Sequence, residues 1–425
     1  MGGIETLHPS LQSFPTGPPS LPLFSSDEVD LAEVAQVALP ALQKISSQEW
    51  QEALRDVGEI SVKRLSGALT NKVFECKWRE PSGKSRRVLV RLYGSEVDAI
   101  FSREQEVETF ERLSRHGYGP QLLAHFPAGR VEEWLHARTL TSPDLRDPVC
   151  SARIAAKLAV FHRLDMGAPR SAVVWPRMRA WLLTALEVAS PLAAAEFCLA
   201  ELEEEIAEME AKLGGHNEEG GEAATGSFAE RTVTEVGSGD EGGKGHCTGV
   251  SRAAAQDKLQ AAGRSRWGIG FCHNDLQYGN LMADERTGAI TIIDYEYAGY
   301  NPIAFDIANH FCEFAADYHS DTPHILDYSR YPSLEQRLRF CQAYLSALGD
   351  NPSAEDVASL VKEADRFTLV SHLQWGLWGV IFSASSNIEF DYAEYSRQRF
   401  RQYFLSKDGL LDRDSCLPAT YGSRP

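Results

Sequence analysis

Apolar and polar positions along residues 72–94 alternate in the way that paired β-strands require. The runs KVFECKW and RRVLVRLYG flank the turn sequence EPSGKS, and two such runs around turn residues predict a hairpin. In the second run Val88, Val90 and Leu92 share one face, whereas Arg91 lies on the other. We therefore expect a small sheet with an arginine on the face opposite these three residues.

The apolar period changes to that of a helix at about residues 102–116. A Ser–Gln capping box begins at Ser102, and Gly117 follows the last helical turn. The apolar stripe of this helix contains Glu106, and a carboxylate in such a position needs a partner. Because Arg91 on the preceding strand is an available cation, we expect the two side chains to form an ion pair.

The rest of the pattern predicts a larger, mainly helical region. A short strand in RVEEWL, residues 130–135, precedes helical segments at about 148–165 and 176–213. The run LMADERTGAITIIDYEYAG, residues 281–299, reads as a second hairpin with RTG at its turn. Helical periodicity then continues to about residue 405, and a cleft between two lobes is the natural place for a site.

Three segments lack periodicity and set the expected domain boundaries. Residues 1–35 are rich in Pro, Ser and Gly and predict an unstructured extension, and 411–425 predict a flexible tail. Residues 214–265 are rich in Gly, Ser and Glu and predict a disordered surface loop, with a regulatory insertion as the alternative. We expect an N-terminal lobe at 36–135 and a C-terminal lobe at 136–410, interrupted by this insertion.

Composition excludes several classes of protein. The 425 residues carry a formal net charge of -18, which disfavours nucleic acid and anionic membranes as partners. No apolar run approaches the roughly 18 residues of a membrane span. The eight cysteines contain no CxxC pair, which predicts reduced thiols and a cytoplasmic location. MGGIET matches a myristoylation pattern at Gly2, although the acidic residue that follows favours coincidence.

The densest polar cluster is FCHNDLQYGNLM, residues 271–282, which has the spacing H-x-D-x4-N. This is the catalytic-loop spacing of phosphotransferases with the protein-kinase fold. An acceptor hydroxyl requires a carboxylate to take its proton, which Asp275 would supply. Magnesium requires hard oxygen ligands, which Asn280 and the later Asp294 would supply. Arg91 would hold the α- and β-phosphates of ATP.

Longer segments carry a family resemblance. The polar cluster, TIIDYEYAGYNPIAFDIANHFCEF and SHLQWGLWGVIFSASSNIEFDYAEYSRQRF resemble signature segments of choline/ethanolamine kinases, most closely the plant-type choline kinases. The likeness runs from about residue 60 to 405, except for the insertion. It implies an α+β, bilobal protein-kinase-like fold with a small β-rich N-terminal lobe and a large helical C-terminal lobe. It also implies ATP-dependent phosphorylation of choline to phosphocholine, the first step of phosphatidylcholine synthesis by the CDP-choline route.

The resemblance further implies which residues bind ATP. Arg91 and Glu106 form the ion pair of the nucleotide lobe, and the family also has arginine at the first position. Residues of LSGALTNKVF match the loop that covers the phosphates, although a single glycine departs from the protein-kinase pattern; they are Ser66, Gly67, Thr70 and Asn71. The segment that meets adenine through its backbone corresponds to Glu133, Trp134 and Leu135.

The substrate pocket can be argued from chemistry as well as from resemblance. Choline is a quaternary ammonium without N–H donors, so its recognition depends on aromatic faces and nearby carboxylates. Trp375 and Trp378 are three residues apart and lie on one face of a helix. The full set that matches the family pocket is Asp275, Gln277, Glu296, Tyr297, Glu313, Tyr318, Trp375, Trp378 and Tyr395.

Several alternatives stay open at this point. Ethanolamine kinases and aminoglycoside phosphotransferases share the catalytic loop, and the tryptophan pair disfavours the second. A dual-specificity enzyme would use the same residues for choline and ethanolamine. A protein kinase is disfavoured because no A-P-E segment follows Asp294. An inactive scaffold that binds nucleotide is the non-enzyme alternative, and a homodimer is one of the assembly states that the sequence leaves open.

Overall fold

The computed structural model describes residues 30–45, 60–65, 71–79, 83–94, 102–214, 267–349, 351–386 and 390–411. Two compact units share them. The first takes in the chain up to Ser95 together with Leu122–Trp134, and the second takes in Glu96–Gln121 and the chain from Leu135 onward. We expected all of residues 36–135 in one lobe, whereas the structure groups Glu96–Gln121 with the second unit.

A five-stranded antiparallel sheet forms the first unit, in the order β1-β2-β3-β5-β4. The strands are β1 (Ser61–Leu65), β2 (Asn71–Arg79), β3 (Ser85–Tyr93), β4 (Leu122–Phe126) and β5 (Gly129–Glu133). The predicted first hairpin is confirmed, since β2 and β3 pair with Asn71 opposite Tyr93. Val88, Val90 and Leu92 are buried as expected from their shared face.

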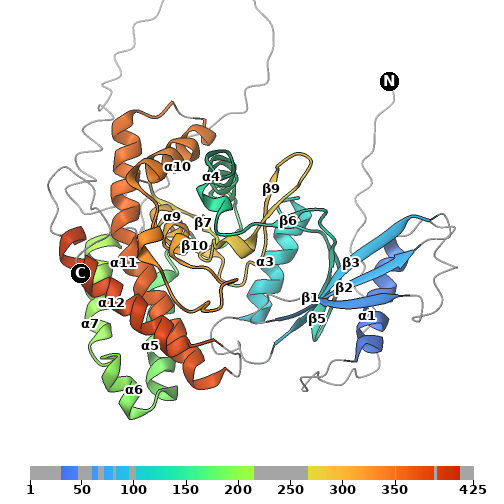
Figure 1. Cartoon of the computed structure of the whole chain (residues 1–425), viewed down its shortest axis with the longest axis horizontal. Coiled ribbons are helices and arrows are strands. Elements are labelled where there is room, and N and C mark those ends of the chain that lie inside the picture. Colours follow the sequence, from blue (N-terminus) through green and yellow to red (C-terminus); the bar gives the residue numbers. More distant parts are fainter. Residues whose placement is uncertain are drawn as a thin grey trace, which may run out of the picture. The chain divides into compact units, whose positions relative to one another are not determined.

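Helix α1 (Leu31–Ile45) covers the apolar face of this sheet (Figure 1). Val34, Ala38 and Leu42 recur every four residues and are buried in one cluster with Val88 and Val90. The expectation of an unstructured extension as far as residue 35 is therefore wrong for residues 31–35. The helix begins there because its apolar stripe is shielded by the sheet.

Helix α3 (Arg103–Arg115) confirms the predicted helix at residues 102–116. The Ser102 side chain accepts a hydrogen bond from the Gln105 amide at 3.4 Å, which caps the helix start. Gly117 follows with a φ of 70°, a left-handed conformation that glycine adopts without strain. Helix α3 buries its stripe within the second unit, where the Phe110 ring lies 6.0 Å from that of Tyr295.

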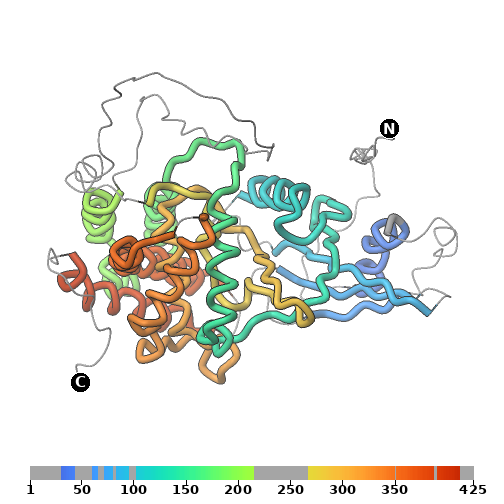
Figure 2. Tube along the Cα trace, turned by 90° about the horizontal axis from the view of Figure 1, so that it is seen from above, coloured from blue at the N-terminus to red at the C-terminus, as the bar shows by residue number. Residues whose placement is uncertain are grey.

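The second unit is mainly helical (Figures 1 and 2). Besides α3, its main helices are α4 (Pro148–His162), α5 (Val174–Val188), α6 (Pro191–Glu196), α7 (Leu202–Leu213), α9 (Ile303–Cys312), α10 (Leu334–Ala347), α11 (Ala354–Ser385) and α12 (Tyr392–Leu411). Helix α11 packs against α5, α9 and α12. No helix in the described ranges combines the length and apolarity needed to cross a membrane.

The predicted helix at 176–213 is divided into α5, α6 and α7. The break after α5 lies at Ser190, whose side chain accepts a hydrogen bond from the Ala193 amide at 3.2 Å. Pro191 follows in the first turn of α6, where its missing N–H is tolerated, but it could not continue the previous helix. Local capping chemistry therefore overrides the apolar periodicity at this point.

Two small sheets hold the loop that contains the polar cluster. Strands β7 (Ile269–Cys272) and β10 (Gly299–Pro302) pair with each other, and β6 (Arg138–Thr139), β8 (Leu281–Ala283) and β9 (Ile290–Ile292) form the other sheet. The antiparallel pairing of β8 with β9 confirms the second predicted hairpin.

Candidate active site

The polar cluster forms a loop between β7 and β8 that ends in a 3-10 turn, Tyr278–Asn280. The side-chain amide nitrogen of Asn280 donates to the backbone oxygen of Asp275 at 2.9 Å and to its carboxylate at 2.8 Å. The Gln277 side chain accepts from the Gly279 amide at 2.7 Å. The five-residue spacing between acid and amide thus lets Asn280 orient Asp275, and Gln277 caps the turn between them.

The histidine of the motif holds this loop to the strand that follows it. Nε2 of His273 lies 2.9 Å from the Ile293 backbone oxygen, and its Nδ1 accepts from the Asp275 amide at 3.3 Å. With Nδ1 as acceptor, the proton belongs on Nε2. Burial lowers the pKa of His273, so the ring is neutral at physiological pH and has a structural role.

Asp306 in α9 holds the loop through hydrogen bonds to its backbone. Its role was not predicted from the sequence. Its carboxylate accepts hydrogen bonds from the backbone amides of His273 at 2.8 Å and Asn274 at 2.7 Å, and Nε2 of His162 lies 3.0 Å away. Burial alone would raise the pKa of Asp306, but the hydrogen bonds from the His162 side chain and from the His273 amide lower it. Cys272 lies beside this group, where burial raises its pKa and keeps the thiol protonated.

Negative charge is concentrated around Asp275. Burial and then the charges of Glu313, Glu296 and Asp294 raise the pKa of Asp275 well above its usual range. Asp294 has a φ of 67°, a conformation that is rare for residues other than glycine and is common at functional sites. A cation bound among these carboxylates would stabilise the charged form of Asp275.

Two oxygen-bearing side chains of the cluster fit a divalent cation. Because Asn280 uses its nitrogen on Asp275, its amide oxygen is directed elsewhere and accepts no bond from the described residues. Asp294 contributes a half-buried carboxylate whose charge reaches Asp275. An amide and a carboxylate oxygen are hard ligands of the kind that magnesium prefers.

An aromatic group lies next to these carboxylates; we define it as Tyr297, Trp375, Trp378 and Tyr395. Ring centroids are 5.3 Å apart for Tyr297 and Trp375, 5.5 Å for Trp375 and Trp378, and 5.9 Å for Trp378 and Tyr395. The charge of Asp275 acts on the hydroxyls of both Tyr297 and Tyr395. The aromatic group and the candidate base therefore belong to one site.

Polar bonds hold the two tryptophans in place. Nε1 of Trp378 donates to the Tyr297 hydroxyl at 2.9 Å, and Nε1 of Trp375 donates to the side-chain oxygen of Asn309 at 2.7 Å. Asn309 in turn donates to the Asn274 backbone oxygen at 3.3 Å. The indole rings are therefore connected to the same loop that carries Asp275, as a preorganised binding site requires.

A buried arginine, which the sequence analysis also missed, organises the other side of the aromatic group. Nη2 of Arg399 donates to the Glu313 carboxylate at 2.7 Å, and its Nε donates to the Tyr395 hydroxyl at 3.0 Å. The Tyr318 hydroxyl donates to the second oxygen of Glu313 at 2.7 Å. Both oxygens of Glu313 are thus engaged by protein groups.

The candidate nucleotide residues lie mainly in the first unit. Arg91 pairs with Glu132 at 3.0 Å, whereas Glu106 in the second unit pairs with Arg103. The predicted Arg91–Glu106 pair stays a prediction. Asn71 begins β2, and Glu133 ends β5.

The adenine segment continues past the end of β5. The Trp134 ring lies 5.6 Å from the Arg87 guanidinium, and Leu135 is half-buried. Ser66, Gly67 and Thr70 lie outside the described residues.

Comparisons with known proteins agree with this geometry. The family model for choline/ethanolamine kinase matches residues 62–220 and 256–404. A probable choline kinase 2 of Arabidopsis thaliana is 46% identical over 372 residues, which cover 87% of this chain and 92% of the relative. A probable ethanolamine kinase of the same organism is 31% identical over 390 residues, 90% of each chain.

A solved structure supports the same assignment. The crystal structure of a choline kinase from Cryptosporidium parvum matches with a TM-score of 0.66 and 25% identity, and covers 90% of this chain and 97% of that one. The bilobal, protein-kinase-like fold class expected from the sequence is confirmed by this match and by the sheet and helical units described above. The chain belongs to the choline/ethanolamine kinase family and is a kinase.

Proposed function

We propose that this kinase transfers the γ-phosphoryl group of ATP to the hydroxyl of choline, which yields phosphocholine for phosphatidylcholine synthesis by the CDP-choline route. The observation that carries the proposal is the position of Asp275 beside the aromatic group, where its charge acts on Tyr297 and Tyr395. The relative with 46% identity is named a probable choline kinase.

The aromatic group suits a trimethylammonium head better than a primary ammonium. A quaternary cation has no N–H to donate and gains from ring faces by cation–π contact, about 1–2 kcal/mol when desolvated. A primary ammonium instead needs hydrogen-bond acceptors, but both oxygens of Glu313 are engaged by Arg399 and Tyr318. Glu296 would contribute negative charge to either substrate, and Gln277 would help to orient it.

Asp275 is proposed to orient the choline hydroxyl and accept its proton. Its raised pKa makes it a stronger base than an exposed aspartate, provided that it is ionised when substrate is bound. A cationic substrate and a metal ion would each lower that pKa, because both favour the charged carboxylate. Binding would therefore prepare the base for the transfer step.

ATP and magnesium would be held by charged and polar side chains and by one backbone segment. Asn280 and Asp294 are proposed to bind magnesium, which supplies positive charge to the phosphates during phosphoryl transfer. Arg91, supported by Glu132, is proposed to contact the α- and β-phosphates. Asn71 and the segment Glu133, Trp134 and Leu135 are proposed to contact the rest of the nucleotide.

The test is product formation by the purified full-length chain. We expect ADP release that depends on choline, with phosphocholine identified by 31P NMR and activity lost when magnesium is chelated. An ethanolamine kinase is the second candidate, since a relative with that name is 31% identical. Phosphorylation of ethanolamine but not choline would favour it, and ADP release with neither substrate would contradict both proposals.

A further inference from the structure

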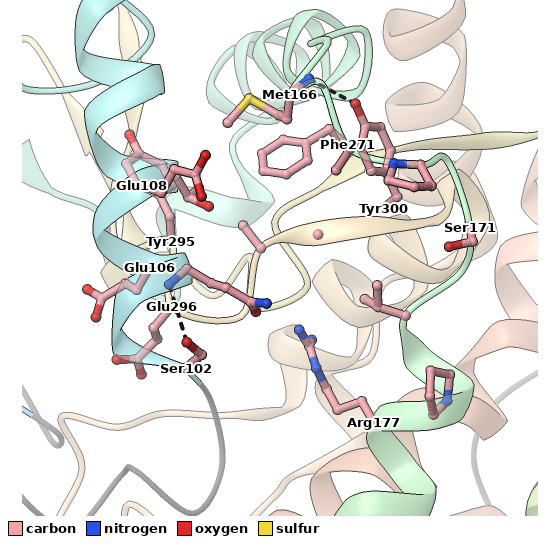
Figure 3. A pocket seen from close by; sticks show the side chains of 18 of the residues that line it. Ser102, Glu106, Glu108, Met166, Ser171, Arg177, Phe271, Tyr295, Glu296 and Tyr300 are labelled. Atoms are coloured by element: carbon pink, nitrogen blue, oxygen red, sulfur yellow. Dashed lines mark hydrogen bonds between the residues drawn. The ribbon is translucent and has the colours of Figure 1, made fainter.

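A cavity of about 660 Å³ lies within the second unit, between α3, α5 and the loop after β9 (Figure 3). Glu106 and Glu108 line it from α3, Arg177 lines it from α5, and Tyr295 and Glu296 line it from the loop. None of the proposed nucleotide or substrate residues except Glu106 and Glu296 lines this cavity. It is therefore largely separate from the site described above.

Arg177, the cation of α5 that lines this cavity, forms no ion pair with a carboxylate among the described residues. Nη1 of Arg177 donates to the Tyr297 backbone oxygen at 2.9 Å, and its other N–H groups have no partner among the described residues. Arg179, two residues further along α5, pairs with Glu203 at 2.9 Å and with Glu210 at 2.6 Å. Desolvation lowers the pKa of Arg177 to about 10, and the charge of Tyr297 offsets only part of this shift.

The carboxylates on the α3 side have cations of their own. Glu106 pairs with Arg103, and Glu108 pairs with Arg112 at 2.9 Å. Arg112 also donates to the Met166 backbone oxygen. Glu296 is the third carboxylate that lines the cavity, and it forms no ion pair with Arg177.

We propose that Arg177 is the centre of an anion-binding site, which takes a small molecule with a phosphate or carboxylate group. The Arg177 side chain is half-buried, so an anion in the cavity can reach its remaining N–H groups, and pairing would offset the hydration that burial removes. Its planar N–H groups match the two oxygens of a phosphate or carboxylate. In Figure 3 the Arg177 side chain extends from α5 toward the interior of the cavity, and the volume leaves room for an organic group behind the anion.

Anion binding at this site would change the geometry of the aromatic group. Arg177 holds the backbone of Tyr297, and the hydroxyl of the same tyrosine holds Trp378. An anion that shifts the guanidinium would shift Tyr297, and by linkage the binding of one ligand would change the affinity for the other. This coupling rests on the proposed function, whereas anion binding itself does not.

Calorimetric titration of the full chain with inorganic phosphate, and separately with acetate, tests the site. A non-hydrolysable ATP analogue with magnesium is kept saturating, so that the nucleotide phosphates do not compete. We expect saturable binding of at least one anion to the wild type. Arg177→Met should raise the dissociation constant about ten-fold or more, as expected for the loss of charge-assisted hydrogen bonds.

Arg179→Met is the matched control, since it removes an arginine from the same helix outside the cavity, and it should bind as the wild type does. If Arg177→Met fails to fold, Arg177→Gln keeps an N–H donor for Tyr297 and removes the charge. Absence of saturable binding of both anions, or equal binding by wild type and the Arg177 variant, would overturn the site. Anion binding without any change in choline affinity would overturn only the coupling.

Discussion

The side-chain amide of Asn280 donates two hydrogen bonds to Asp275 within one loop, one to its backbone oxygen and one to its carboxylate. Asp275→Asn would keep the size and much of the hydrogen bonding of this side chain but remove the base. We expect turnover to fall by roughly 100- to 10,000-fold, the usual contribution of a general base. The affinity for a non-hydrolysable ATP analogue should stay close to that of wild type, as titration calorimetry would show. Near-normal turnover in the folded variant would contradict the assignment.

The carboxylates around Asp275 predict a pH dependence. Asp275 accepts a proton only when ionised, so kcat/KM should decline as pH falls through its raised pKa. Glu296→Gln removes one neighbouring negative charge and so lowers the pKa of Asp275. The decline of kcat/KM on the acid side of the pH profile, which we call the acid limb, should therefore move to lower pH. Profiles of kcat/KM against pH would show the shift. Glu204→Gln on the exposed side of α7 is the control, and an unchanged limb in Glu296→Gln would contradict the charge cluster.

At the scale of elements, the close contact between α11 and α12 positions Trp375, Trp378 and Tyr395. A Cβ at Gly379 would lie 2.3 Å from the Ser396 hydroxyl and 3.0 Å from the Tyr392 backbone oxygen. Gly379→Ala should therefore separate the helices, lower the free energy of unfolding by about 1–3 kcal/mol and raise KM for choline.

Gly409→Ala, also in α12, is the control for the helix contact. Among the described residues, no side chain or neighbouring element lies within 4 Å of a Cβ at this position, so the substitution should be neutral or slightly stabilising. Urea unfolding and initial rates would compare the two variants. Equal stability of both would show that α11 and α12 do not need the glycine at 379.

Elements with local signals could be predicted from the sequence, and those that depend on distant partners could not. The capping residue Ser102 and the left-handed Gly117 bound α3 as predicted, because both act within one helical turn. Helix α1 was missed because its apolar stripe is short, and the helix is stabilised only when this stripe packs against the sheet. The division of 176–213 was missed because the apolar period continues across Ser190 and Pro191, although a capping serine followed by proline is itself a local signal for a helix start.

At the scale of the whole molecule, the motif residues were recognisable but their supports were not. Arg399 and Glu313 are 86 positions apart, and Asp306 lies 33 positions after the His273 amide that it holds. A single sequence contains no signal for such pairs, because each residue alone is compatible with an exposed surface position. Arg177 could not be singled out from the sequence either, because only the structure shows that no carboxylate of the described residues pairs with it.

The family match also bears on the segment between α7 and β7. The match omits residues 221–255, which is within the low-periodicity insertion expected at 214–265; this part of the chain lies outside the described residues. Deleting 221–255 should leave kcat/KM for choline within about two-fold of wild type, since a shorter loop costs little to close. Initial rates and gel filtration would test this. Loss of activity or solubility would show that the segment contributes to the catalytic unit.

The most direct test of the account is the specificity constant for choline and for ethanolamine, measured side by side for wild type, Trp378→Ala and Trp378→Phe. We expect wild type to prefer choline. Trp378→Ala should lose more of its kcat/KM for choline than for ethanolamine, mainly through KM, because ring contacts to the trimethylammonium exist before and during transfer. Trp378→Phe should retain a good part of the preference. A wild-type preference for ethanolamine, or an equal loss for both substrates in Trp378→Ala, would contradict choline recognition by the aromatic group.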